Sequence, residues 1–178
     1  MTLHRRRIAS PVGELTLVGG DAGLRAVLFA RETVPGDAVE GCHPVLDEAA
    51  RQLCEWFAGE RTVFDLPLDL AAATAFRRRA WLALAEIPYA TTRSYGEQAR
   101  RLGMPRAARA VGAANGRNPL SIVLPCHRLI GADGSLTGFS GGLEVKRALL
   151  AHEAATAAGP GAADSSRTRR SPAPRPRT

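Results

Sequence analysis

Alternating apolar and polar positions near the N-terminus predict a small antiparallel sheet. Apolar residues recur at every second position over 15–17 and again over 24–28, which is the period of a strand with one buried face. Glycine-rich turn chemistry separates the two stretches at 19–23. We therefore expect two or three strands in a meander over residues 5–29, followed by a loop over 30–43.

A helical period follows the predicted sheet. Over residues 45–57 the apolar side chains share one helical stripe, and Gly59 lies just past its end as a stop signal. The stripe consists of Leu46, Ala49, Ala50, Leu53, Trp56 and Phe57. The run 64–68 is predicted to be a last edge strand that leads into a linker at 69–73. No residue of this first predicted domain, 1–73, stands in a pattern that indicates chemistry.

Three short helices are predicted in the second domain, residues 74–153. The first spans 74–87 and is stopped by a proline. A Ser-x-x-Glu capping box predicts a helix over 95–102, and the next helix is predicted over 106–114. Because a tight turn with Gly103 joins the last two, they form a helix-turn-helix pattern. A small sheet followed by a mostly helical domain makes the fold class α+β.

The helix predicted over 106–114 has little side-chain bulk apart from its arginines. Its small residues are Ala107, Ala108, Ala110, Gly112, Ala113 and Ala114. Reading base edges in the major groove requires long polar side chains, whereas a smooth helix can approach the backbone and the groove floor closely. We therefore expect shape-based DNA binding without base reading, with Arg106 at the start of the helix. Arg109 stands alone on the smooth face. From the sequence alone, a phosphate contact or a solvated charge is a serious alternative to any more specific role of this side chain.

The candidate chemistry lies at Pro125-Cys126-His127-Arg128. The apolar run 122–124 reads as a short buried strand, which Pro125 ends because it has no N–H to donate. Cys126 is a candidate nucleophile if its neighbours His127 and Arg128 favour the thiolate. Adjacent side chains of an extended backbone point to opposite faces, so a Cys–His contact through a water or a bent loop is expected. The alternative is a small buried hydrophobic residue.

Composition excludes several classes of protein. No apolar run approaches the ~20 residues of a membrane span, and the basic N-terminus lacks the apolar core of a secretory signal, so a cytoplasmic protein without membrane contact is expected. Cys42, Cys54 and Cys126 cannot all pair and lack ligand spacing, which argues against a disulfide framework and against a bound metal. Cys54, on a helical apolar face, is predicted to be core. No cofactor is expected.

The net charge of +7 is unevenly distributed. Residues 1–75 hold seven Arg and eleven Asp and Glu, a net charge of −4. Residues 76–153 hold twelve Lys and Arg against five acidic residues, a net charge of +7, and the remainder carries +4. The second domain is therefore expected to face a polyanion, although a GC-rich genome explains part of the arginine excess.

Taken together, four segments resemble the catalytic domain of the O6-alkylguanine-DNA alkyltransferases, the self-methylating DNA repair proteins. They are 106–119, 122–129, 138–143 and 146–153. The family signature is Pro-Cys-His-Arg with an Asn-Pro before it and a Gly-Gly-Leu after it. The resemblance implies a ribonuclease-H-like first domain without a catalytic role and a winged helix-turn-helix-like catalytic domain. It also implies a monomer that acts on double-stranded DNA containing O6-alkylguanine, with O4-alkylthymine as a further candidate substrate.

The resemblance assigns roles to the reactive group. Cys126 displaces the alkyl carbon from a guanine that has left the base stack, and the resulting thioether restricts each molecule to one reaction. His127 takes the thiol proton through a water, and Glu153, at the end of a helix over 142–153, fixes the imidazole. The alternative for Glu153 is a surface carboxylate at a fraying helix end.

Further roles are implied for groups around the base. Tyr95 donates to a ring nitrogen of guanine, the backbone of Ser140 donates to O6, and the carbonyls of Cys126 and Leu129 hold the exocyclic amine. Asn118 ties the recognition helix to the active-site strand, and Arg109 fills the space of the extruded base. Phe139 departs from the tyrosine of many relatives, so no hydroxyl contact is expected there. A packed aromatic is the alternative for Tyr95, and a plain Asn-Pro turn for Asn118.

Other protein classes fit the sequence less well. A cysteine hydrolase would also use a Cys, a His and an acid, but it would not explain the smooth helix-turn-helix. Binders that recognise lesions without transferring the group usually replace the motif cysteine with tryptophan, and Cys126 argues against them. The additional metal-binding domain of the adaptive-response regulators is absent from the sequence, which argues against a transcriptional role. The Ala-, Pro- and Arg-rich tail, residues 154–178, is expected to be disordered.

Overall fold

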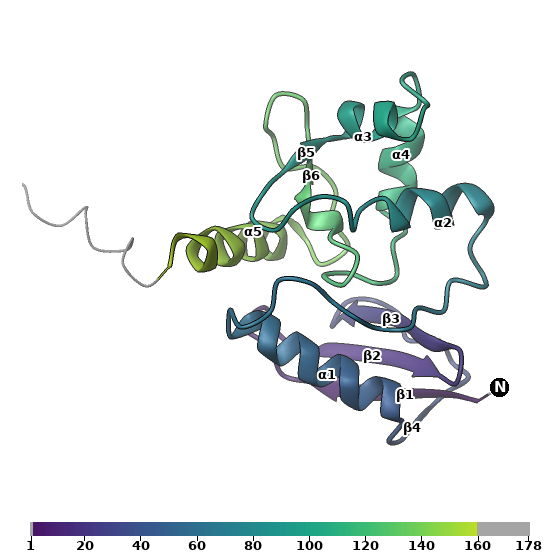
Figure 1. Cartoon of the computed structure of the whole chain (residues 1–178). Coiled ribbons are helices and arrows are strands. Elements are labelled where there is room, and N and C mark those ends of the chain that lie inside the picture. Colours follow the sequence, from purple (N-terminus) through teal and green to yellow (C-terminus); the bar gives the residue numbers. More distant parts are fainter. Residues whose placement is uncertain (1, 160–178) are drawn as a thin grey trace, which may run out of the picture.

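The structure, a computed structural model, describes residues 2–159 and has a sheet half and a helical half (Figure 1). The first half contains the strands β1 (Leu3–Ile8), β2 (Leu15–Gly20), β3 (Gly23–Phe29) and β4 (Ala38–Glu40) with the helix α1 (Pro44–Phe57). The second contains α2 (Ala75–Leu82), β5 (Arg93–Ser94), α3 (Tyr95–Arg101), α4 (Ala108–Asn115), the 3-10 turn η1 (Cys126–Arg128), β6 (Leu129–Ile130) and α5 (Leu143–Ala158). The predicted α+β class is confirmed.

The N-terminal sheet has the strand order β3-β2-β1-β4. β1, β2 and β3 pair antiparallel, as the alternating pattern predicts. β4 pairs parallel with β1, with Leu3 opposite Ala38, although residues 30–43 were expected to be loop throughout. Three residues are too few to produce a detectable period, so sequence pattern alone could not indicate this edge strand.

Helix α1 forms with the predicted apolar stripe, packs that stripe against the sheet, and lies across the sheet in Figure 1. His43 caps its N-terminus, because the His43 Nδ1 accepts the backbone N–H of Val45 at 3.3 Å. Cys54 is exposed, so its assignment to the core was wrong. The position next to buried Leu53 lies ~100° further around the helix and leaves the stripe.

The run 64–68 makes a single bridge, Leu24 with Leu68, and forms no strand. The carbonyl of Pro67 accepts the N–H of Leu24 at 2.7 Å, but Pro67 has no N–H to continue a ladder. The side chain of Gln52 replaces that pairing, since it bonds both the N–H and the carbonyl of Asp65. The predicted edge strand is therefore a loop fastened by a side chain.

The helical half follows the predicted order, and α2, α3 and α4 are each shorter than predicted. Thr74 caps α2, which ends at Leu82 rather than at 87 and continues in single turns with i to i+3 bonds, such as Ile87 N–H to Leu84 carbonyl at 3.0 Å. A helix tightens in this way before a proline, which disfavours helical geometry in the preceding residue. The capping box of Ser94 and Glu97 is present at the start of α3.

The apolar run 122–124 is buried but is not a strand, which corrects the prediction. It forms turns in which the N–H of Leu124 reaches the carbonyl of Leu120 at 2.8 Å, and Ile122 has a φ of +73°. The apolar character of this run reports burial, and burial alone does not distinguish a strand from a packed turn.

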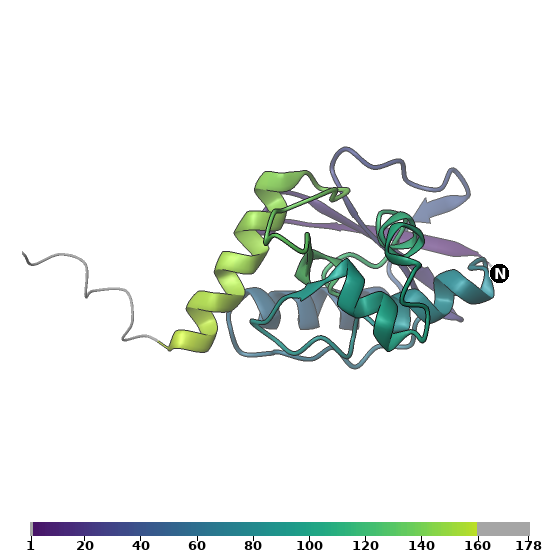
Figure 2. The ribbon, with the colours of Figure 1, turned by 90° about the horizontal axis from the view of Figure 1, so that it is seen from above.

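One hydrophobic core continues from the sheet half into the helical half and includes Trp56, Leu84 and Leu129. The backbone N–H of Val27 in β3 donates to the carbonyl of Pro119 at 2.8 Å, so the sheet directly contacts the segment that leads to Cys126. α5 flanks one side of the molecule (Figure 2) and extends to Ala158. The first residues of the predicted disordered tail are therefore helical, and residues 160–178 lie outside the described residues.

Candidate active site

Cys126 begins the 3-10 turn η1 directly after Pro125 and is 3% exposed. Its N–H donates to the carbonyl of Leu124 at 2.7 Å, which draws the backbone into a turn in place of the extended approach expected from the sequence. Burial raises the pKa of the Cys126 thiol, whereas the side chains of Asn118 and Ser121 and the charge of Lys146 act in the opposite direction. Its reactivity therefore depends on the groups that surround it.

A buried ionic cluster lies next to the thiol. The His127 Nε2 is 2.8 Å from the Glu153 Oε1, and the guanidinium of Arg128 contacts both oxygens of Glu153 at 2.8–3.0 Å. The N–H of Ala90 donates to the Glu153 Oε2 at 3.0 Å. Glu153 is fully buried, so the alternative of a surface carboxylate is excluded.

The cluster fixes the protonation of its members. Burial would raise the pKa of Glu153, but hydrogen bonds from His127 and Arg128 hold that pKa below its ordinary value. Burial lowers the pKa of His127, although Glu153 opposes this shift. The neutral imidazole therefore donates from Nε2 to Glu153, an assignment inferred from the hydrogen-bond network. Its Nδ1 is left as an acceptor that is buried and has no partner among residues 2–159.

Asn118 connects the end of α4 to the turn that carries Cys126. Its amide donates to the carbonyl of Leu124 at 2.8 Å, and its Oδ1 accepts the N–H of Leu120 at 3.1 Å. Asn115, the last residue of α4, places its amide 3.5 Å from the Cys126 carbonyl. A displacement of α4 would therefore be transmitted to the backbone of the thiol.

The loop over residues 131–142 lies between Tyr95 and α5. The Thr137 hydroxyl donates to the Tyr95 Oη at 3.4 Å, and Ser140 is exposed. Phe139 packs against Phe29 of the sheet with ring centroids 5.4 Å apart. The Leu129 carbonyl, expected to face a base, accepts a hydrogen bond from Lys146 Nζ at 2.5 Å, and its second lone pair remains for another donor.

Most residues predicted to bind DNA lie in α4, but Arg106 lies in the turn before the N-cap Ala107 and not at the start of the helix as predicted. Arg106, Arg109 and Ala110 are exposed, while Ala107, Ala108 and Gly112 are half-buried. The Tyr95 ring lies over Gly112, since a β-carbon at Gly112 would be 3.7 Å from its Cδ1. Neither Arg106 nor Arg109 forms a salt bridge with any residue in the described part of the chain.

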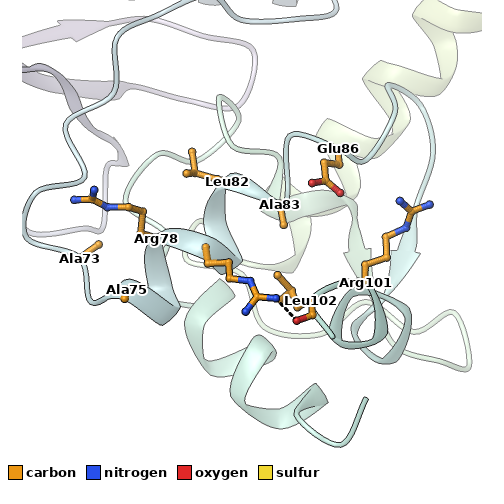
Figure 3. A pocket seen from close by; sticks show the side chains of 9 residues that line it. Ala73, Ala75, Arg78, Leu82, Ala83, Glu86, Arg101 and Leu102 are labelled. Atoms are coloured by element: carbon orange, nitrogen blue, oxygen red, sulfur yellow. Dashed lines mark hydrogen bonds between the residues drawn. The ribbon is translucent and has the colours of Figure 1, made fainter. Parts of the chain in front are cut away.

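A cavity of about 710 Å³ lies between α2 and the end of α3, away from the buried cluster of His127, Arg128 and Glu153. Arg78 and Arg101 stand on opposite sides of it (Figure 3). Arg79 donates to the carbonyl of Leu102 and Arg78 to that of Leu70, so two of its guanidinium groups already bond the backbone. Cys126 does not line this cavity, and we assign the chemistry to the buried cluster because it holds the nucleophile and the titratable groups.

Comparisons with known proteins match both halves. The family description "6-O-methylguanine DNA methyltransferase, DNA binding domain" matches residues 75–155, and "6-O-methylguanine DNA methyltransferase, ribonuclease-like domain" matches residues 3–70. The chain belongs to the 6-O-methylguanine DNA methyltransferase family. The resemblance stated from the sequence is thereby confirmed.

Individual members of this methyltransferase family are similar over most of their length. A methylated-DNA–protein-cysteine methyltransferase of Mycobacterium tuberculosis is 49% identical over 150 residues, which cover 83% of this chain and 90% of the relative. One of Methanosarcina acetivorans is 48% identical over 145 residues, covering 79% and 92%. The crystal structure of Mycobacterium tuberculosis OGT in complex with DNA has a TM-score of 0.81 at 48% identity and covers 86% of this chain and 94% of that chain.

Two buried charged residues of this methyltransferase site were missed as site members. Arg128 was considered only as a neighbour of the thiol, yet it holds Glu153 and donates to the carbonyl of Ile87 at 2.6 Å. Lys146 is fully buried in α5 and was given no role. A signal was available for Lys146, because it is the single lysine in a sequence whose other basic residues are all arginine.

The described residues contain no group of three or more His, Cys, Asp or Glu side chains placed to hold a metal. Within the same residues, every helix is too short or too polar to cross a membrane.

Proposed function

We propose that this protein repairs alkylated guanine in duplex DNA by transferring the alkyl group from guanine O6 to the sulfur of Cys126. It then has the methylated-DNA–protein-cysteine methyltransferase activity that its relatives are named for. The observation that carries the proposal is the buried Cys126, His127 and Glu153 cluster next to an exposed, smooth helix-turn-helix. A cysteine hydrolase would have no use for that second feature.

The chemistry is a direct displacement at the alkyl carbon. The Nδ1 of His127 accepts the thiol proton through a water, and Glu153 with Arg128 keeps the imidazole oriented. The thiolate forms the S–C bond as the C–O bond to guanine breaks, and the electron pair of that bond leaves with the base. The hydroxyl of Tyr95 and the backbone N–H of Ser140 are the proposed donors to the departing guanine. A thioether has no displaceable group, so the reaction occurs once.

The proposed DNA contact is made by α4. Ala107, Ala108, Ala110 and Gly112 allow close approach to the duplex, Arg106 contacts phosphate, and Arg109 occupies the space left by the extruded nucleotide. The structure of the Mycobacterium tuberculosis relative in complex with DNA supports DNA binding as such. Transfer from O4-alkylthymine would need the same displacement.

Organisation beyond the site remains proposed. We retain residues 1–73 as a supporting domain, 74–153 as the catalytic and DNA-binding domain, and 154–178 as a tail. The helical residues up to Ala158 move the start of any disordered tail beyond α5. A monomeric, cytoplasmic protein stays a prediction.

The test is the mass of the protein after incubation with duplex DNA that carries one O6-methylguanine. We expect a single methyl-sized gain on the peptide that contains Cys126. The gain should be absent in Cys126→Ala and present in Cys54→Ala, which removes an exposed thiol. Binding without a mass gain would show that the protein is a lesion binder. The absence of both DNA binding and a mass gain would disprove the proposal.

A further inference from the structure

Lys146 is a fully buried cation in the second turn of α5. Its ammonium donates to two backbone carbonyls, those of Leu129 at 2.5 Å and Thr137 at 2.9 Å. No carboxylate among residues 2–159 forms a salt bridge with it. A buried charge without a counter-ion is costly, so its retention calls for a partner that balances it.

The remaining candidate for that partner is the thiol of Cys126. Glu153, the buried carboxylate on the same helix, is already paired with His127 and Arg128. Leu129, whose carbonyl holds the ammonium, closes the 3-10 turn by donating its N–H to the carbonyl of Cys126. The cation is thus anchored one hydrogen-bonded turn from the backbone of Cys126. Burial raises the pKa of the Cys126 thiol and lowers the pKa of the Lys146 ammonium, and the charge of each group opposes the shift of the other.

The presence of lysine rather than arginine at position 146 supports a specific role for this side chain. All other basic side chains of this sequence are arginine, so whatever favours arginine elsewhere in the chain does not act at this position. A guanidinium is planar and broad, whereas an ammonium is a compact point charge with three donors on a flexible stem. Two of these donors reach carbonyls on different segments, and the described residues show no hydrogen bond from the third.

We propose that Lys146 is a positioning residue that serves as counter-cation to the Cys126 thiolate and holds the Thr137 loop against Leu129 beside it. The inference rests on the proposed transfer to Cys126 for its consequence, but the charge coupling exists without DNA. Loss of the cation then makes the thiolate harder to form. It also loosens the loop that carries Ser140 on one side of the base.

The decisive measurement is the titration of Cys126 in the free protein. The difference in thiolate absorbance between a protein and its Cys126→Ala counterpart gives the pKa of this thiol, separately from Cys42 and Cys54. In Lys146→Met we expect that pKa to rise by about one unit or more, which is at least ten-fold less thiolate at neutral pH. Arg147→Met is the matched control, because Arg147 is an exposed neighbour paired with Glu144 on the surface. Its thiol should titrate as in the wild type.

The pH profile of methyl transfer separates this role from a purely structural one. Lys146→Met should react slowly near neutral pH and recover towards the wild-type rate as the pH rises and the thiolate forms without help. An equal loss of transfer rate at every pH, or an unchanged pKa of the thiol, would disprove the role of Lys146 as counter-cation. If the wild type transfers no methyl group, the proposed function fails while the thiol titration still tests the pairing.

A second measurement does not depend on the folding of Lys146→Met. Because the chain has one lysine, protein labelled with ¹⁵N-lysine gives a single side-chain ammonium signal. In the wild type this signal should shift with pH as Cys126 titrates. In Cys126→Ser the shift over that range should disappear. A signal that behaves identically in both proteins would also disprove the pairing.

Discussion

At the scale of single residues, the buried ion pair of Glu153 and Arg128 holds the imidazole of His127 in one place. Each oxygen of Glu153 has at least two donors, supplied by His127, Arg128 and the N–H of Ala90. A frame of this kind holds one tautomer and one ring orientation, which general-base chemistry at His127 requires.

Glu153→Gln should destabilise the protein by about 3–5 kcal/mol, because it leaves the buried guanidinium of Arg128 without its counter-charge. The free energy of unfolding from urea titration measures this. Glu144→Gln, on the same helix but exposed, is the control and should change it by less than about 1 kcal/mol. Similar losses in both variants would contradict the energetic role of the cluster.

The same residue predicts a pH dependence. The pKa of Glu153 is lowered on folding, so its ionised form contributes stability that is fully present above the ordinary glutamate pKa of 4.5. That contribution is lost as the pH falls through the lower pKa of the folded state. The stability difference between wild type and Glu153→Gln should therefore stay constant near neutral pH and shrink in acid. A difference that grows below pH 4.5 would contradict the sign of the shift.

The sequence alone could identify part of this site, whereas the rest depends on how the chain folds. The thiol, the imidazole and Asn118 belong to one short motif, so the sequence could identify them. The pairing of Arg128 with Glu153 spans 25 positions, and whether a carboxylate at a helix end is buried depends on what packs over it. The burial of Lys146 likewise follows from the placement of the loop and α5, which no local pattern encodes.

At the scale of elements, α4 is rich in alanine, which favours a helix, but two local features weaken it. Its N-cap, Ala107, makes no side-chain cap bond, and Gly112 occupies its interior. The sequence predicted this helix and its bareness, but it placed the start two residues too early. It also took the apolar run 122–124 for a strand, since burial and strand period are indistinguishable over three residues.

Gly112→Ala should raise the free energy of unfolding by about 0.5–1 kcal/mol, because glycine in a helix interior loses more backbone freedom than alanine. The added β-carbon would meet the Tyr95 ring at 3.7 Å, an ordinary contact. Urea denaturation tests this. Gly103→Ala provides the contrast, since its φ of +70° disfavours a side chain and the variant should be less stable than the wild type. A loss of stability in Gly112→Ala would show that the ring cannot accept the methyl group.

The DNA contact proposed for α4 predicts the effect of a negative charge there. Ala110→Glu should weaken binding to duplex DNA by about ten-fold at low salt, because it adds bulk and repulsion where phosphates approach. Fluorescence anisotropy with a labelled duplex measures this. Ala154→Glu places the same charge on an exposed position of α5 and should have a smaller effect. Equal effects in both variants would indicate that only net charge matters.

At the scale of the whole molecule, the sheet half supports the reactive half through a shared core. The N–H of Val27 bonds the carbonyl of Pro119, and His152 of α5 bonds the carbonyl of Trp56 at 2.9 Å. The two faces of the sheet differ, however. One faces the common core, while the other buries a small separate cluster of Leu3, Val18, Ala26, Leu28 and Ala38.

Because the two faces of the sheet bury different clusters, substitutions on each face can distinguish an effect on stability from an effect on activity. Phe29→Ala should cost about 3–5 kcal/mol of folding free energy as a core deletion, and it should also slow methyl transfer, because Phe29 packs against Phe139 in the loop proposed to face the base. Leu28→Ala removes a side chain from the separate cluster and should cost about 2–5 kcal/mol with no change in the transfer rate of the folded protein.

Single-turnover rates under conditions where both variants remain folded would decide the matter. A slower rate confined to Phe29→Ala means that the sheet positions the reactive loop as well as adding to the core. Equal rates would limit the sheet to supplying stability, and slowing in both variants would mean that the rate follows global stability rather than one contact.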